Sequence, residues 1–245
     1  MKNFISNTGA ETLKKRLVEL ISKSQELKFL VGFFYFSGIR ELYEGLKKNP
    51  DVSLKVLVGL SIDVQNYGLV EYAEKEKFSD EEKACNFFDS IKKSLNTENF
   101  DNKEFYEQIT YFIKLINENK LIIRKTFEPN HSKLYIFKLD ESQVGKRNLF
   151  ITGSSNLTKA GISTQNEFNV EIGDYGVEEA NEYFDSLWEN AVKISEFTDL
   201  KKKLVEVIEK ETLIKEISPF EAFCLVLKTY LDSFEQKEVG GVLIK

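Results

Sequence analysis

Two apolar runs near the N-terminus constrain the fold more than any other feature of the chain. Residues 29–36 read FLVGFFYF and residues 52–60 read VSLKVLVGL. Each run is far too short to cross a membrane and fits a buried β-strand. The stretch between them carries Leu42 and Leu46 at helical spacing and reaches Pro50, before which a helix must end. Strand, helix and strand in this order predict parallel strands joined by a crossover. We therefore expect an α/β fold with a mixed, largely parallel β-sheet flanked by helices.

The remaining patterns divide the chain into a domain and a helical extension. Ser79 and Glu82 form a capping box for a helix that reaches about Ser94, and a second helix follows it. Together they form an expected helical insertion over about residues 71–119. Strands are then expected at residues 121–127, 133–139, 148–152 and 167–172, with a helix at about 177–191. We predict one domain over residues 1–195 and a C-terminal helical extension over residues 196–245.

The last part of the chain carries one more helix-start signal. Ser218, Pro219 and Glu221 supply an N-cap, a proline at the first helical position and a capping-box glutamate. The final residues, GGVLIK, have the character of a further apolar element. We therefore expect the chain to lead into another domain beyond Lys245.

Composition excludes several kinds of site. The net charge of −6 argues against a broadly basic nucleic-acid-binding surface, although it permits a local cationic cleft. One histidine and two widely spaced cysteines, Cys85 and Cys224, cannot assemble a Cys/His zinc site. The cysteines are expected to be buried thiols in a reducing compartment, and the N-terminus lacks the apolar core of a signal peptide. We expect a cytoplasmic protein without a membrane span.

Reactive side chains concentrate in residues 130–171. Residues two apart on a strand face the same side, so His131 and Lys133 should point together, as should Ser154 and Asn156. On the following strand the same rule separates a polar set from an apolar set: Glu167, Asn169 and Glu171 against Phe168, Val170 and Ile172. Three neighbouring strand ends would then offer a histidine, a lysine, a hydroxyl, an amide and a carboxylate to one point.

That combination suits a phosphodiester. A lysine and an asparagine can hold the non-bridging oxygens, and a serine hydroxyl and the N–H groups of a Gly-Ser turn can add hydrogen bonds. A histidine can attack phosphorus or protonate a leaving oxygen, while a carboxylate on its far ring nitrogen would fix its tautomer. This chemistry requires no metal, and we expect no cofactor.

The pattern HSK…GSSN resembles the HKD signature of the phospholipase D superfamily, in which His-x-Lys is followed by Gly-Ser-x-Asn. The matching residues are His131, Lys133, Gly153, Ser154 and Asn156, and Glu167 matches the downstream acidic position. The segments FFYFSG, LKVLVGL, GSSNLTKAG and YFDSLWENAV resemble the single-motif nuclease subset, which includes restriction endonucleases and domains at the front of superfamily 2 helicases. The likeness covers most of residues 25–192. Two positions depart from the pattern: Lys138 stands where the full motif has Asp, and Gln165 where the subset tends to have Asn.

The resemblance implies a phospholipase D-like endonuclease, a metal-independent hydrolase that cleaves DNA through a phosphohistidine. The family's chemistry uses two histidines, which small members supply from two subunits, so the resemblance implies a homodimer with both copies of His131 in one cleft. The implied catalytic residues are His131, Lys133, Ser154, Asn156 and Glu167. Secondary candidates for substrate contacts are Gly153, Ser155, Tyr135, Arg124, Lys159 and Asn169.

Other interpretations stay open at this point. A dimerising DNA-binding module of a helicase, without catalysis, would fit the net negative charge. Lipid phosphodiester hydrolysis is disfavoured because no helix pairs an apolar face with a strongly basic one. RNA is not excluded as a substrate, and a fused helicase or specificity domain would be the partner. Tyr135 could serve packing alone, and Gly153 a turn.

Overall fold

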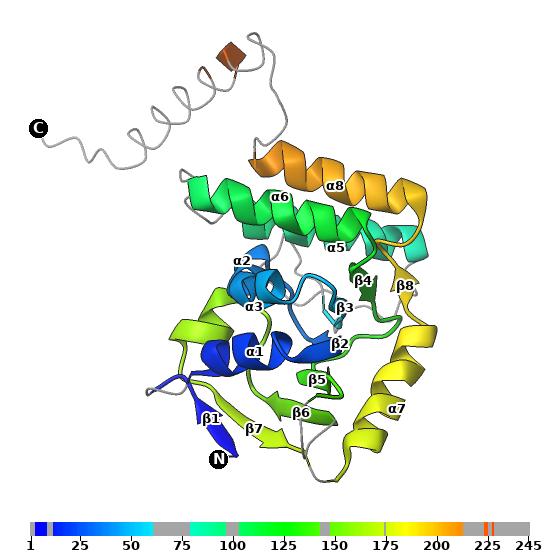
Figure 1. The fold of residues 1–245 in the computed structure, drawn as a ribbon. Coiled ribbons are helices and arrows are strands. Elements are labelled where there is room, and N and C mark those ends of the chain that lie inside the picture. Colours follow the sequence, from blue (N-terminus) through cyan, green and yellow to red (C-terminus); the bar gives the residue numbers. More distant parts are fainter. Residues whose placement is uncertain are drawn as a thin grey trace, which may run out of the picture.

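A central β-sheet organises the part of the chain that the computed structural model describes, which comprises residues 3–8, 12–60, 79–96, 103–142, 148–173, 175–212, 223–224 and 227. Eight strands in these residues form the sheet in the order β1-β7-β6-β5-β2-β3-β4-β8 (Figure 1). Their bounds, in that order, are Phe4–Ser6, Phe168–Ile172, Asn148–Gly153, Leu134–Leu139, Ser24–Val31, Ser53–Val58, Leu121–Lys125 and Val192–Lys193. The predicted mixed α/β class is confirmed.

The expectation of a largely parallel sheet is wrong. Among the described strands, only the β2–β3 and β3–β4 pairs are parallel, and the remaining neighbours run antiparallel. Helical crossovers link β2 to β3 and β3 to β4, and a crossover is what a parallel pair requires. The strands β5, β6 and β7 follow one another and pair with their chain neighbours, which makes them antiparallel. The two N-terminal apolar runs therefore represent the parallel part of the sheet only.

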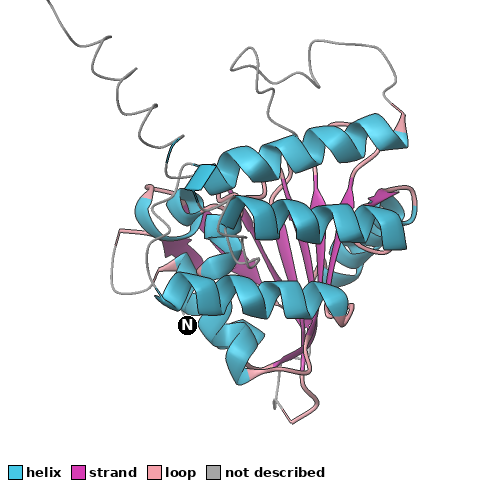
Figure 2. Ribbon diagram, turned by 90° about the horizontal axis from the view of Figure 1, so that it is seen from above, coloured by secondary structure: helices cyan, strands magenta, loops and turns pink. Residues whose placement is uncertain are grey.

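Both faces of the sheet are covered by apolar layers. Consecutive residues of the central strands alternate between them: Phe29 and Val56 belong to the larger cluster, and Leu30 and Leu57 to the smaller one. The helices that supply the larger cluster are α1 (Leu13–Ile21), α2 (Phe36–Arg40), α3 (Tyr43–Lys48), α5 (Asp80–Asn96), α6 (Lys103–Asn117) and α8 (Thr198–Thr212). The smaller cluster is closed by α7 (Val177–Glu189), which packs on β5 and β6. Figure 2 shows long helices lying across one side of the strands.

The helices of the expected insertion form as predicted at α5 and α6. Ser79 and Glu82 make both bonds of the capping box, since the Ser79 N–H donates to the Glu82 carboxylate and the Glu82 N–H donates to Ser79 Oγ. Helix α8 lies beside α5 and α6 and buries Leu204 and Ile208 in the larger cluster (Figure 1). The helix start at Ser218–Glu221 and the GGVLIK segment lie outside the described residues.

Two further expectations from the sequence concern the cysteines and a membrane span. Cys85 on α5 and Cys224 are both exposed, so the prediction of buried thiols is wrong. Among the helices described, none combines the length and apolar character needed to cross a membrane.

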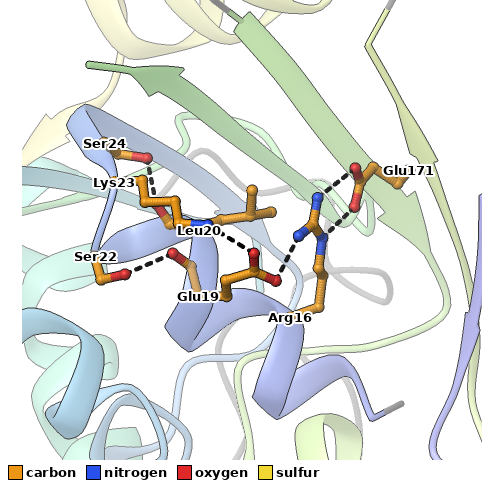
Figure 3. A network of polar contacts seen from close by, with 7 residues as sticks. All are labelled: Arg16, Glu19, Leu20, Ser22, Lys23, Ser24 and Glu171. Atoms are coloured by element: carbon orange, nitrogen blue, oxygen red, sulfur yellow. Dashed lines mark hydrogen bonds and ion pairs between the residues drawn. The ribbon is translucent and has the colours of Figure 1, made fainter. Parts of the chain in front are cut away.

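A buried ion pair ties α1 to the sheet. Thr12 caps α1 by accepting a hydrogen bond from the Lys15 N–H, and the helix buries its leucine face in the larger cluster. On the neighbouring face, Arg16 donates two hydrogen bonds to the Glu171 carboxylate on β7, at 2.6 and 2.7 Å, and a third to Glu19 (Figure 3). Glu171 therefore does not lie on a solvated strand face, because α1 covers that side of β7.

Candidate active site

Six strands each have one end along the same edge of the sheet, where the edge meant is the row of strand ends and not an edge strand. The strands β2, β3 and β4 are parallel, so their C-terminal ends meet there. Strand β5 runs the opposite way, and the pairs Leu30 with Leu134 and Leu134 with Thr152 place the start of β5 and the end of β6 at the same edge. The start of β7 joins them, because Gly153 pairs with Asn169. The two halves of the HKD-like pattern, His131–Lys133 before β5 and Gly153–Asn156 at the end of β6, are thus adjacent in space.

His131 and Lys133 lie next to each other, as predicted. The Lys133 Nζ is 3.0 Å from each His131 ring nitrogen and donates to the His131 carbonyl oxygen at 2.7 Å. Lys133 is buried, whereas His131 keeps an exposed ring whose edge meets Phe33. Partial burial and the nearby Lys133 charge lower the pKa of His131. Burial also lowers the pKa of Lys133, and the negative charge of Glu167 opposes that shift.

Asn156 is held at the same point by the backbone of the β2 end. Its Oδ1 accepts a hydrogen bond from the Phe33 N–H at 3.1 Å. A Cβ on Gly32 would lie 3.0 Å from Asn156 Oδ1 and 3.1 Å from His131 Cδ2, so both side chains rest against this glycine. The Asn156 amide N–H₂ makes no hydrogen bond to the described residues. It is therefore a donor for the oxygen of a ligand beside His131.

Ser154 and Glu167 form a hydrogen-bonded pair. The Ser154 hydroxyl donates to the Glu167 carboxylate and accepts from the Phe168 N–H at 3.1 Å. The Ser154 N–H in turn donates to the Phe168 carbonyl oxygen. The sequence predicts a carboxylate on the far ring nitrogen of the histidine, and the acidic member of the implied catalytic set is Glu167. Within the described residues it contacts Ser154 instead, and Lys133 lies beside the His131 ring.

Several secondary candidates lie behind the site and do not line it. Tyr135 is fully buried, and its hydroxyl donates to the Ser155 carbonyl oxygen at 2.7 Å, so burial raises its pKa. Asn169 is also fully buried and donates to Ser155 Oγ at 2.9 Å. The predicted alternation on β7 is therefore reversed, because Asn169 faces the interior and Phe168 is 58% exposed. Gly153 leaves room for Asn169, whose Oδ1 would lie 2.6 Å from a Cβ there.

The basic side chains considered beside Lys133 lie in different places. Arg124 is not brought to the site, since it donates to the Glu196 carboxylate and the Trp188 carbonyl oxygen and stacks on the Trp188 ring. Lys159 is exposed and directly precedes a π-helical turn, η1 (Ala160–Thr164), three residues beyond Asn156. Lys138 is exposed at the far end of β5, in register with Glu26 and Asn148, about 16 Å along the strand from Lys133.

The residues that support the His131 loop are not among the candidates that the sequence indicates. A Cβ on Gly59, after β3, would lie 1.8 Å from the Asn130 carbonyl oxygen, and the Asn130 N–H donates to Gly59 O at 3.0 Å. The Asn130 side chain accepts from the Ser132 N–H and donates to Tyr183 Oη on α7. The available signal was a glycine within each of the two apolar runs, and these glycines, Gly32 and Gly59, directly follow β2 and β3.

Comparison with known proteins defines the family. The chain is similar to Nuc, a phospholipase D family member from Salmonella typhimurium, at 13% identity and a TM-score of 0.42, over 78% of this chain and 95% of that one. It is similar to NucT from Helicobacter pylori at 13% identity and a TM-score of 0.40, over 74% and 90%. It also resembles phosphatidylserine synthase from Haemophilus influenzae at 15% identity and a TM-score of 0.48, over 88% and 47%. No curated protein matches the chain. Residues 17–188 match the family model described as cardiolipin synthase, PLD-like domain, and the chain therefore belongs to the phospholipase D-like family.

Proposed function

We propose that the protein is a metal-independent nuclease that hydrolyses DNA phosphodiesters through a phosphohistidine in a composite homodimer site. The observation that carries this proposal is the grouping of His131, Lys133 and Asn156 at the sheet edge. An exposed imidazole lies beside an ammonium group and an amide donor that makes no hydrogen bond to the residues described. The proposed catalytic set is completed by the bonded pair Ser154 and Glu167.

The first step would be attack on phosphorus by a neutral imidazole nitrogen of His131. An N–P bond forms, the bond from phosphorus to the leaving oxygen breaks, and a proton must reach that oxygen. The lowered pKa of His131 favours the neutral ring that attack requires. The Lys133 ammonium and the Asn156 amide would hold the non-bridging oxygens, where negative charge builds up.

Both steps need a second proton-transfer group on the far side of phosphorus, because the leaving oxygen must gain a proton in the first step and the attacking water must lose one in the second. In the described residues no other imidazole is available, since His131 is the only histidine of the chain. The partner subunit's His131 would protonate the leaving oxygen and then, as a base, deprotonate the water that breaks the N–P bond. A two-fold axis through the site supplies that group by symmetry.

The setting of this nuclease is part of the proposal. We place it as a module of a helicase or restriction system, because the resemblance of residues 25–192 is to those proteins. DNA is the proposed substrate, with RNA as an alternative to be tested alongside. The net charge of −6 favours one competing function, a non-catalytic dimerising DNA-binding module.

The decisive experiment is nicking of supercoiled plasmid DNA in the presence of EDTA. Wild type should nick, and His131→Ala should lose at least about 100-fold in rate. Lys133→Ala should also lose activity. Lys138→Ala is its matched control, because it removes the same charge from the far end of β5 and should leave the rate unchanged.

The outcome also separates the competing functions. A dimer that binds DNA but cleaves no DNA, RNA or phospholipid would refute the nuclease proposal in favour of the non-catalytic module. Hydrolysis of phospholipid vesicles without nucleic-acid cleavage would instead identify a lipid phosphodiesterase.

A further inference from the structure

A buried polar cluster lies directly beneath the turn that carries Ser154 and Asn156. It consists of Tyr135, Ser155 and Asn169, each fully buried. We infer that Asn169 is a positioning residue, which aims Ser154 and Asn156 at a bound phosphate by fixing Ser155 between them. This inference rests on the proposed function of the site and assigns Asn169 a role without contact to the substrate.

The hydrogen bonds define how Ser155 is held. Asn169 Nδ2 donates to Ser155 Oγ at 2.9 Å, and Tyr135 Oη donates to Ser155 O at 2.7 Å. Side chain and carbonyl of one residue are thus fixed from two different strands, β7 and β5. Because Ser155 is joined covalently to Ser154 and Asn156, these two bonds restrict the peptide planes on both sides of it.

The Asn169 side chain is maintained at an energetic cost. Its Oδ1 is buried and has no hydrogen-bond partner among the described residues. An unsatisfied buried acceptor is destabilising, and a leucine of similar size would avoid that cost but would leave the buried Ser155 Oγ without its donor. The turn nevertheless lies directly on this amide, since a Cβ on Gly153 would lie 2.6 Å from Oδ1 and 2.3 Å from the Phe168 carbonyl oxygen. The useful group is therefore the Nδ2 donor that faces Ser155.

The hydrogen bonds at the two ends of the turn show how Ser154 and Asn156 are oriented. On one side, the Ser154 hydroxyl reaches Glu167 and the Phe168 N–H. On the other side, Asn156 Oδ1 accepts from the Phe33 N–H, and its amide N–H₂, which makes no hydrogen bond within the described part of the chain, can donate to a ligand. A rotation of the Ser155 peptide planes would turn both side chains away from a common point beside His131.

The substitution Asn169→Asp gives a readout that simple packing would not. When protonated, its carboxyl can donate to Ser155 Oγ as the amide does; when ionised, it cannot donate, so the Ser155 hydroxyl would have to turn and donate to it, and a negative charge would be buried beneath the turn. Burial raises the pKa of such a carboxyl above its ordinary value of about 3.9. The ratio of variant to wild-type kcat should therefore rise as the pH falls, with a midpoint above that value.

Two further variants test whether a lower kcat comes from misfolding or from the lost orientation of the turn. Asn169→Leu exchanges the unsatisfied Oδ1 for a Ser155 Oγ without its donor, so the melting temperature should stay near that of wild type, while kcat falls about 10- to 100-fold at every pH because the turn loses its orientation. Ser155→Ala removes the acceptor and should lower kcat by a similar factor. The double variant should lose no more than either single one, since both break the same bond.

The measurement pairs plasmid nicking with binding of sulfate, a tetrahedral anion whose charge is constant over this pH range. A wild type that binds sulfate but cleaves nothing would refute the nuclease function; weaker sulfate binding in Asn169→Leu would still support the positioning role. The inference is overturned if Asn169→Leu keeps wild-type kcat and sulfate affinity, if the loss in Asn169→Asp does not vary with pH, or if wild type binds no sulfate.

Discussion

At the scale of single residues, the protonation state of His131 decides what the site can do. Partial burial is the larger cause of its lowered pKa, and the Lys133 charge adds to it. Both influences disfavour the imidazolium, so the ring stays neutral to lower pH than a free histidine. A neutral ring is the form that attacks phosphorus.

This shift can be observed directly, because the chain has only one histidine to titrate. The ring resonances of His131 should give a pKa below the ordinary 6.5 in an NMR titration. Lys133→Met should raise that pKa, since it removes a positive charge that opposes protonation, while burial keeps the value lowered in part. Lys138→Met, at the far end of β5, should leave it unchanged. A fall in the pKa of His131 on removal of Lys133 would contradict this electrostatic account.

Individual residues also show where sequence reasoning succeeds. The spacing was sufficient to place His131, Lys133, Ser154 and Asn156 together. The alternation of side chains along a strand and the resemblance to the HKD signature both predict this grouping. The motif departure at Lys138 proves distant from the site, so it gives no reason to expect a defective phosphate site. Asn169 was misjudged because its side of β7 is buried by α1 and by the Gly153–Asn156 turn, which no pattern within β7 reveals.

At the scale of elements, the two strand-end glycines have different roles. A Cβ on Gly59 would meet a backbone carbonyl at 1.8 Å, which cannot move without the loop that carries His131. A Cβ on Gly32 would touch the side chains of Asn156 and His131 at 3.0 and 3.1 Å, and side chains can shift by small amounts.

Alanine at these two positions should therefore separate stability from activity. Gly59→Ala should lower the free energy of unfolding by about 1–3 kcal/mol, as overpacking does, and lower activity with it. Gly32→Ala should lower the free energy of unfolding by less than about 1 kcal/mol. It should still reduce phosphodiesterase activity, because it displaces the side chains of His131 and Asn156. Denaturant unfolding and nicking rates measure the two effects. Equal losses of stability would show that the two close approaches are equivalent.

The pair formed by Arg16 and Glu171 belongs to the same scale, because it joins α1 to β7. Both side chains are largely buried, at 11% and 6% exposure. Arg16→Met should lower the free energy of unfolding by about 3 kcal/mol, since it leaves the Glu171 charge buried without its partner. Lys23→Met breaks the exposed pair with Glu19 on the same helix and should cost less than about 1 kcal/mol. Urea denaturation compares them, and equal costs would exclude a special role for the buried pair.

The elements themselves were largely predictable. The capping box at Ser79 and the apolar stripes indicated α5 and α6, and the strand signals matched β4 to β7 closely. The direction of the strands was not predictable from the first strand–helix–strand unit, because orientation depends on how each later strand is connected. The site edge combines six separate segments, and no single segment contains enough information to place it.

At the scale of the whole molecule, one histidine per chain makes the proposed chemistry depend on two subunits. Wild type and His131→Ala should form mixed dimers when their subunits exchange. At equal amounts, activity should fall to about a quarter of that of the same total amount of wild type, because only that fraction of dimers carries two histidines. Independent monomers would keep about half. Nicking rates across a series of mixing ratios distinguish a quadratic dependence from a linear one.

The hydrogen bond from Phe33 to Asn156 spans 123 residues of sequence, and the site edge as a whole runs from Gly32 to Asn169. Contacts of such long range form late, after most of the chain is available. During synthesis on the ribosome, the His131 loop therefore emerges before Ser154 and Asn156, which complete its surroundings. A chain released between His131 and Ser154 carries the histidine without the residues that complete the site, so we expect such truncated copies to lack the proposed activity.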